Sequence, residues 1–386
     1  MSIVSMAPMP PFHIGSGAVD GVTAAAVRLS TSRCVMIVLD RFWQGTPVFT
    51  RLTQSLADAE LAVCTYADFH GEPKSPDIEA IAAIGRTSGA DLIIGLGGGA
   101  ALDAAKIASC CIPGQADPEF YGFGLNPLPP VVLPTILIPT TAGTGSEANS
   151  TAIFTARDRK KSWIYGQALT TRLAVLDPDL TASLPPPVAA ACGMDALVHA
   201  FESATNANAN AITRMASLDA LRLICGALRL SVNEPDNVAA RQAMLLGSFY
   251  AGYGISNAGT AVAHNVSHAL AALHPVAHGH ATALAFEQSL PWVLGSNDVG
   301  VDEAAAACGT DRSGLVSFIA QLMDDVGLER QLPNAFTAAG EAMLLEQMNA
   351  PENHPMRDAT LPPLTQEAMA DIAWRVLELA KVRTRA

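Results

Sequence analysis

The chain has 386 residues, of which 50% are hydrophobic and 15% are charged, and its formal net charge at pH 7 is -13. This length is sufficient for two domains with hydrophobic cores, and the apolar content excludes a disordered chain. The acidic balance, without any basic run, argues against nucleic acids and anionic membrane surfaces as partners.

Cysteine usage and the N-terminal segment predict a cytoplasmic protein. The seven cysteines contain no C-x-x-C pair, so neither a disulfide framework nor a thiolate zinc site is expected. The first 17 residues lack the charged and apolar regions of a signal peptide. The longest apolar stretch, residues 129–143, is interrupted by prolines and too short to span a membrane.

The first 180 residues alternate between strand-like and helix-like stretches. Continuous apolar runs at 34–40, 91–97, 135–141 and 172–178 are typical of strands buried on both faces of a parallel sheet. A helical, turn-rich segment follows the first run, and a helix is expected at 100–111. This pattern predicts a doubly wound α/β domain.

The character of the sequence changes after the proline-rich stretch 184–187. The remainder is rich in Ala and Leu and shows helical patterning without a convincing alternating strand. We therefore expect an α/β domain at 1–183 and an all-helical domain at 184–386.

A glycine triplet follows the second predicted strand and precedes a helix. Gly97, Gly98 and Gly99 allow bare backbone N–H groups to approach a pyrophosphate at the helix N-terminus. The match of this segment to the G-x-G-x-x-A fingerprint is weak alone, and a tight strand–helix turn is the alternative.

Two further features suggest contacts with a dinucleotide. Four hydroxyl side chains at and beyond the end of the third strand can donate to a phosphate or to a nicotinamide amide, although a capped loop is the alternative: Thr140, Thr141, Thr144 and Ser146. Asp40 ends the first strand, and a carboxylate there can accept from both ribose hydroxyls and repel a 2′-phosphate. This position predicts NAD rather than NADP, unless Asp40 is a capping or solvent-exposed residue.

Histidines are concentrated in an apolar, helical part of the chain. Asp195 and His199 are four residues apart and so share one helix face, and His264 and His268 have the same spacing. His278 follows the break at Pro275. Each histidine alone is commonly a hydrogen-bonded core residue, but together with the aspartate they predict a site for Fe(II) or Zn(II).

Six motifs occur along the chain in a fixed order and spacing: GGGAALDAAK, PTTAGTGSEANS, LDPDLTASLPP, GMDALVHAFES, NAGTAVAHNVSHAL and AHGHA. By these motifs the chain resembles the iron-containing (group III) alcohol dehydrogenases over essentially its whole length. The resemblance implies an N-terminal α/β dinucleotide domain, a C-terminal helical metal domain and an active site in the cleft between them.

The same resemblance implies a role for each candidate residue. His268 matches a histidine beside the nicotinamide and substrate, and Lys161 matches a lysine that reaches the cofactor, with Lys160 as a close rival. The glycine triplet matches the pyrophosphate loop, and the three threonines match those around the nicotinamide. The family's metal ligands correspond to Asp195, His199, His264 and His278.

Four positions depart from the family's usual pattern. Ala100 stands where a serine often follows the glycines, Asn149 replaces a frequent Thr or Ser, and Ile255 replaces an aromatic residue found in some members. The substrate pocket is therefore expected to differ from that of any one relative. His280 is interpreted as a residue behind the ligands or on the surface.

These features predict an NAD-dependent, metal-containing alcohol dehydrogenase that interconverts a small primary or secondary alcohol and its aldehyde or ketone. His268, or a ribose hydroxyl and water, is expected to carry the proton away. We also expect a homodimer or larger homo-oligomer. A metal-free reductase like the maleylacetate reductases is one alternative, although the complete ligand set argues against it. A lyase of the dehydroquinate-synthase type is another, although no basic residues cluster near the histidines.

Overall fold

The computed structural model describes residues 5–338 and 340–381, and it divides into two compact units. One, the sheet unit, contains Met1–Thr141 and Gly145–Ala182; the other, the helical unit, contains Ala142–Thr144 and Ser183–Ala386. The units divide after Ala182. The assignment of residues 142–144 to the helical unit was not foreseen.

The sheet unit is built on six parallel strands in the order β1-β8-β5-β4-β2-β3. The four predicted strands are all present, and β1 and β3 were missed. β1 has only three residues, and β3 is an edge strand whose partly exposed side chains form no continuous apolar run. The strands are β1 (Phe12–Ile14), β2 (Cys34–Leu39), β3 (Ala62–Tyr66), β4 (Leu92–Gly97), β5 (Thr135–Pro139) and β8 (Leu173–Leu176).

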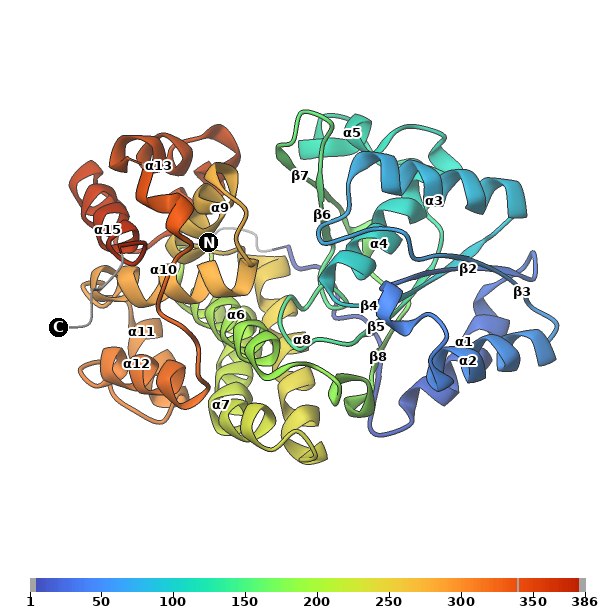
Figure 1. The fold of residues 1–386 in the computed structure, drawn as a ribbon, viewed down its shortest axis with the longest axis horizontal. Coiled ribbons are helices and arrows are strands. Elements are labelled where there is room, and N and C mark those ends of the chain that lie inside the picture. Colours follow the sequence, from blue (N-terminus) through green and yellow to red (C-terminus); the bar gives the residue numbers. More distant parts are fainter. Residues whose placement is uncertain (1–4, 339, 382–386) are drawn as a thin grey trace. The chain divides into compact units, whose positions relative to one another are not determined.

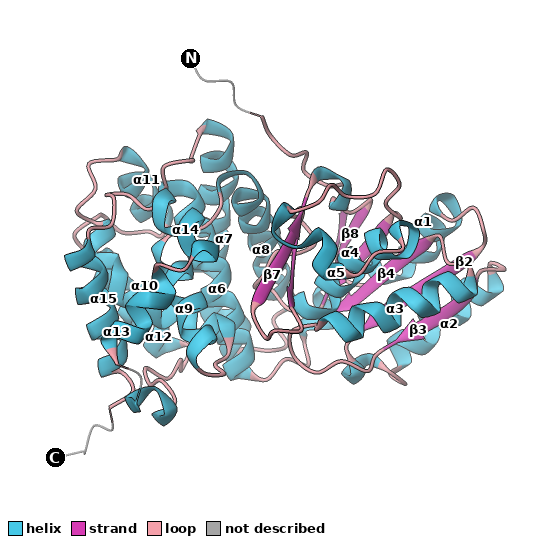
Figure 2. Ribbon diagram, turned by 90° about the horizontal axis from the view of Figure 1, so that it is seen from above, coloured by secondary structure: helices cyan, strands magenta, loops and turns pink. Residues whose placement is uncertain are grey.

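Helices cover both faces of this sheet, as a doubly wound fold requires (Figure 2). Alternate residues of β2 point to opposite faces. Met36 and Val38 pack in one core with α3 (Ser75–Ser88) and α4 (Gly99–Gly114). Ile37 and Leu39 pack in the other core with α1 (Val22–Leu29) and α2 (Pro47–Asp58).

An antiparallel hairpin, β6 (Thr151–Thr155) and β7 (Lys161–Tyr165), lies outside the parallel sheet. A short helix, α5 (Pro118–Tyr121), precedes β5 in the chain, and the hairpin itself contacts α4. Sequence analysis did not predict the hairpin, because its strands alternate between buried and partly exposed residues and follow a polar loop.

The described residues of the helical unit contain no strand, as expected. Its central helix is α6, which packs against α7, α8 and α10 (Figure 1). No described helix combines the length and apolar character needed to cross a membrane. The helices are α6 (Pro186–Thr205), α7 (Ala211–Asn233), α8 (Val238–Ala258), α9 (Val262–Leu273), α10 (His278–Val293), α11 (Val299–Ala307), α12 (Leu315–Asp325), α13 (Glu341–Met348), α14 (His354–Ala359) and α15 (Gln366–Glu378).

The second half of α6 is buried all round, from Gly193 to Thr205. Such burial suits a helix that is covered on every side by other helices. It also means that the polar side chains within this segment need partners inside the protein, because buried polar groups without partners are costly.

Candidate metal centre and dinucleotide loops

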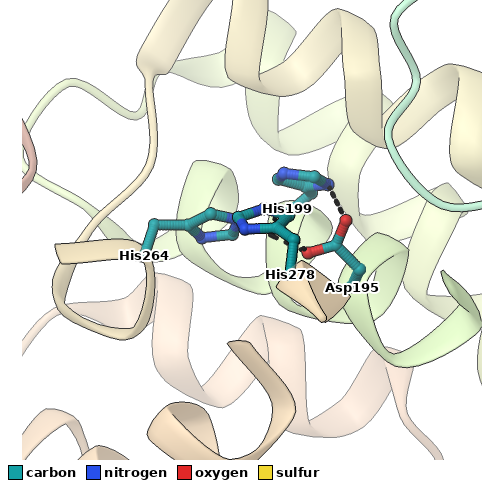
Figure 3. A group of neighbouring side chains, drawn as sticks. All are labelled: Asp195, His199, His264 and His278. Atoms are coloured by element: carbon teal, nitrogen blue, oxygen red, sulfur yellow. Dashed lines mark ion pairs between the residues drawn. The ribbon is translucent and has the colours of Figure 1, made fainter. Parts of the chain in front are cut away.

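The four predicted ligands come from three helices of the helical unit. Asp195 and His199 lie one turn apart on α6, His264 lies in the first turn of α9, and His278 begins α10. Figure 3 shows the three imidazole rings gathered around the carboxylate of Asp195. One ligand atom from each residue can be chosen such that all four atoms lie within 4.8 Å of one another.

The carboxylate of Asp195 is the common neighbour of the three rings. Its Oδ1 lies 3.6 Å from Nε2 of His264 and 3.6 Å from Nε2 of His278, and its Oδ2 lies 3.9 Å from Nδ1 of His199. The rings of His199 and His264 stack with centroids 4.4 Å apart. These separations are too long for hydrogen bonds, and the two that involve Nε2 of His264 and Nε2 of His278 are compatible with a cation between the donor atoms.

Burial indicates that this cluster fits a divalent cation. Asp195, His199 and His264 are 2%, 5% and 2% exposed, and only His278 is partly accessible. Within the described residues, neither Asp195 Oδ1 nor His264 Nε2 has a hydrogen-bond partner. Burial of these two facing atoms costs free energy unless a positive charge, carried by a proton or a metal cation, lies between them. One carboxylate and three imidazoles are a donor set suited to Fe(II) or Zn(II).

The electrostatics of the cluster favour positive charge beside Asp195. Burial alone would raise the pKa of the Asp195 carboxyl, but the imidazoles of His199, His278 and His264 outweigh it and hold this pKa well below its usual value. Burial would lower the pKa of His264, but Glu202 and Asp195 raise it to about 9. A cation that enters this site therefore displaces a proton.

A loop carbonyl orients the His199 ring. Nδ1 of His199 donates a hydrogen bond to the carbonyl oxygen of Gly143 at 3.2 Å, which leaves Nε2 as the nitrogen with a lone pair. A Cβ on Gly143 would lie 2.9 Å from both Cβ and the carbonyl oxygen of Cys192. The loop reaches His199 this closely because residue 143 is a glycine.

The other histidines of the segment lie outside the four-residue cluster. His268 is one turn beyond His264 on α9, and its ring centroid lies 6.4 Å from that of His264 and 5.6 Å from that of His278. His274 packs edge-on against Phe336. Nε2 of His280 forms a hydrogen bond of 2.6 Å with the carbonyl of Glu329, so this residue has a partner away from the cluster.

In the sheet unit, Asp40 lies beside the glycine loop. The Gly98 N–H donates to Asp40 Oδ2 at 2.6 Å, and a Cβ on Gly97, whose φ is 154°, would lie 2.4 Å from the same oxygen. Burial raises the pKa of Asp40, and the Gly98 hydrogen bond partly offsets this effect. Adjacent β2 and β4 thus bring the predicted acid and glycines together, with Asp40 accepting from the N-cap residue of α4.

The threonine segment and the lysines are also placed. The Thr140 N–H donates to the Gly97 carbonyl at 2.9 Å, which ties the end of β5 to the glycine loop. Thr140 and Thr141 belong to the sheet unit, whereas Thr144 belongs to the helical unit. Nζ of Lys161 forms an ion pair of 3.0 Å with Glu72.

Sequence reasoning missed a buried polar network beneath the hairpin. Lys106 on α4 is fully buried, and its ammonium donates to the Ser146 carbonyl at 2.9 Å, to Asn149 Oδ1 at 3.0 Å and to the Thr151 carbonyl. Asp103, one turn earlier, pairs with Lys106 at 3.2 Å. The sequence feature that could have revealed this network is the D-x-x-K spacing of Asp103 and Lys106 within an otherwise apolar helix. The network also gives the unusual Asn149 a role, because its amide holds the loop to α4.

Comparison with known proteins identifies the family. Residues 10–178 match the model of the iron-containing alcohol dehydrogenases, and residues 189–373 match the C-terminal model of the Fe-containing alcohol dehydrogenase family. The chain belongs to this family, and it is therefore an oxidoreductase of the alcohol dehydrogenase type.

Individual relatives act on different compounds. The chain is 34% identical to long-chain-alcohol dehydrogenase 1 of Geobacillus thermodenitrificans over 76% of this chain and 74% of that protein. It is 33% identical to sulfoacetaldehyde reductase of Bilophila wadsworthia over 83% of each chain. A crystal structure of sulfoacetaldehyde reductase from Bifidobacterium kashiwanohense in complex with NAD+ superposes with a TM-score of 0.88 and 26% identity, covering 99% of this chain and 100% of that one.

Proposed function

We propose that this protein interconverts a small primary or secondary alcohol and its aldehyde or ketone, using NAD(H) and a divalent cation, Fe(II) or Zn(II). The observation that carries this proposal is the buried cluster of Asp195, His199, His264 and His278, whose ligand atoms lie within 4.8 Å of one another. The relatives named above, which act on alcohols or aldehydes, and the NAD+ bound by one of them support it.

Each predicted residue has a distinct task in this proposal. When bound, the cation supplies a Lewis acid that lowers the pKa of the substrate hydroxyl, and NAD+ supplies the hydride acceptor. The backbone of the glycine loop holds the pyrophosphate, and Asp40 at its edge accepts from the ribose hydroxyls. The nicotinamide half is oriented by Thr140, Thr141, Thr144 and Lys161.

His268 is the proposed proton carrier. Oxidation of an alcohol releases a hydride and a proton, so a group near the cation must accept that proton. His268 lies near two of the proposed ligands, with its ring centroid 5.6 Å from that of His278, but it is not among the four donors. Four protein ligands leave only a further coordination position, which the substrate oxygen needs, so we assign His268 to the proton and not to the cation.

The complete ligand cluster also favours this function over the two alternatives. A metal-free reductase has no use for a buried carboxylate surrounded by three imidazoles, and such a cluster is costly without a cation. A lyase for a phosphorylated acid needs basic side chains at its site. The cluster itself offers one acid and three imidazoles, and its described ion pairs join only histidines and acids.

The test is a panel of short alcohols and aldehydes with NAD(H) and NADP(H). Each is assayed with protein stripped by a chelator and with protein reloaded anaerobically with Fe(II) or Zn(II). We expect turnover only after reloading, with NAD(H) preferred. Full activity of the stripped protein would refute the metal-dependent reaction.

Replacement of His268 tests the proton step separately. His268→Ala is expected to retain the metal and the fold but to lower turnover by about 10²–10³-fold, with loss of the limb of the pH–rate profile near neutrality. Metal content is measured on the same sample. Loss of metal together with activity would make His268 a ligand, and no change in either would make it a core residue.

A further inference from the structure

The carboxylate of Glu202 is a buried group to which the predicted site assigned no role. Glu202 lies on α6 seven residues after Asp195 and three after His199, so all three share one face of the helix. It is only 3% exposed. A carboxylate buried so completely is unfavourable unless several donors compensate for the loss of water.

Three donors converge on this carboxylate, all at 2.7 Å. Oε2 accepts from the Ala261 N–H and from Nδ1 of His264, and Oε1 accepts from the Ala263 N–H. The donors lie within four consecutive residues around the start of α9. One side chain of α6 thus fixes both the backbone and the first ligand of α9.

The backbone contacts replace a missing helix cap. α9 begins at Val262, and its N-cap residue, Ala261, has no side chain that can accept from the free N–H groups of the first turn. Glu202 accepts from two of these groups, and its negative charge is favourable at a helix N-terminus. The position of His264 relative to α6 therefore depends on Glu202.

The contact with the imidazole determines which nitrogen faces the proposed cation. Because Nδ1 of His264 donates a hydrogen bond to Glu202, Nε2 is the nitrogen that loses its proton and offers a lone pair when a cation binds. That nitrogen is 3.6 Å from Oδ1 of Asp195. The hydrogen bond also limits rotation of the ring, which keeps Nε2 directed at the donor atoms of α6 and α10.

We propose that Glu202 is a positioning residue of the metal centre, which holds the His264 ring in the orientation and tautomer that bind the cation. The inference rests on the proposed function, because it assumes that His264 is a ligand. A neutral carbonyl, that of Gly143, orients His199 in the same way. At His264 a carboxylate does so, which makes the ligating nitrogen a stronger donor.

The test measures metal binding and not turnover. Chelator-stripped protein is titrated anaerobically with Co(II) and Zn(II), and affinity is obtained by competition with a chelating dye. The visible spectrum of bound Co(II) reports its coordination. Glu202→Gln keeps the shape of the side chain but replaces one acceptor oxygen with a donor, so it cannot satisfy all three N–H groups. We expect metal affinity to fall by about 10–100-fold and the Co(II) spectrum to change.

Asn206→Ala is the matched control for the loop between α8 and α9. The Asn206 amide donates to the carbonyls of Ala258 and Gly259 at 3.1 and 3.0 Å, and none of its described hydrogen bonds involves His264. The control is expected to lower the melting temperature of the metal-free protein and to bind metal like the wild type. If both variants lose similar stability and both keep wild-type metal affinity, Glu202 is only a helix cap and the inference is wrong.

Two further outcomes are decisive. If Glu202→Gln is insoluble, Glu202→Asp takes its place; it keeps the charge but is shorter by one carbon–carbon bond of about 1.5 Å, so weaker metal binding is expected and unchanged binding overturns the inference. If the wild type itself binds no cation, the proposed metal chemistry fails together with this inference. If the wild type binds a cation and both Glu202 variants bind it equally well, only the role of Glu202 is wrong.

Discussion

Substitution of Gly279 with alanine is expected to disrupt the metal centre without removing any ligand. Gly279 follows His278 at the start of α10, where the backbone lies directly against α6. A Cβ at residue 279 would lie 2.4 Å from the Ala191 carbonyl oxygen and 3.3 Å from Asp195 Cβ. Carbon and oxygen atoms normally approach no closer than about 3.3 Å, so the start of α10 must move by roughly 1 Å.

A displacement of this size exceeds what a metal site tolerates. Ligand distances in functional sites lie within about 0.2 Å of their ideal values. His278 moves with the start of α10, so metal affinity is expected to fall, and turnover with it by about 10²-fold. Metal bound per chain after anaerobic loading with Zn(II), together with turnover on the same sample, measures the effect.

Gly226→Ala provides the matched control. Gly226 lies within α7 of the same unit, and a Cβ there would have no atom within 4 Å. This change is expected to stabilise the protein by about 0.5–1 kcal/mol, the usual preference of a helix interior for alanine, and to leave metal binding unaltered. Wild-type metal content and turnover in Gly279→Ala would refute the argument, because the backbone contact would then not determine the position of His278.

Three further substitutions test other parts of the molecule. Burial raises the pKa of Glu147 from 4.5 to about 7. The free energy of unfolding of the wild type is therefore highest below pH 4.5, where the carboxyl is neutral in both the folded and the unfolded chain, and it falls as the pH rises through 7. Relative to wild type, Glu147→Gln should therefore gain up to about 3 kcal/mol of stability between pH 4 and 8, and urea unfolding that shows a pH-independent difference would contradict this. Asp40→Ser should shift the cofactor preference towards NADP by about 1–3 kcal/mol, calculated from the ratio of the kcat/KM values for NADP and NAD. A wild type that already prefers NADP would contradict the role of Asp40. His264→Ala should abolish stoichiometric metal and turnover, and either one surviving alone would show that the two are not linked.

The sequence predicted the central strands of the sheet well because burial on both faces leaves an unambiguous pattern. β2 and β4 are continuous apolar runs whose every residue is buried, and both were located to within one residue. β3 and the β6–β7 hairpin were missed because partly exposed strands mix polar with apolar residues. Edge strands are therefore the part of such a sheet that apolar runs alone do not reveal.

The sequence nominated residues for the candidate site but not their geometry. Helical spacing paired Asp195 with His199 and His264 with His268, and family resemblance then selected the ligands, including His278. Neither source contained the distances among α6, α9 and α10, which arise from tertiary packing. Glu202 illustrates the limit: it stood within the motif GMDALVHAFES, but its three partners begin 59 residues later in the chain.

Glycines explain part of the sequence of two of the six family motifs. Gly279, in the AHGHA motif, and Gly143, in the PTTAGTGSEANS motif, each bring backbone against α6, at Ala191 and at Cys192 respectively. These two contacts lie three to four residues before Asp195, on the turn that precedes the ligands. An added Cβ at either glycine would fall within 3 Å of α6 backbone, so both approaches require the absence of a side chain. The proposed metal centre therefore depends as much on residues that allow close packing of the backbone as on its four proposed ligands.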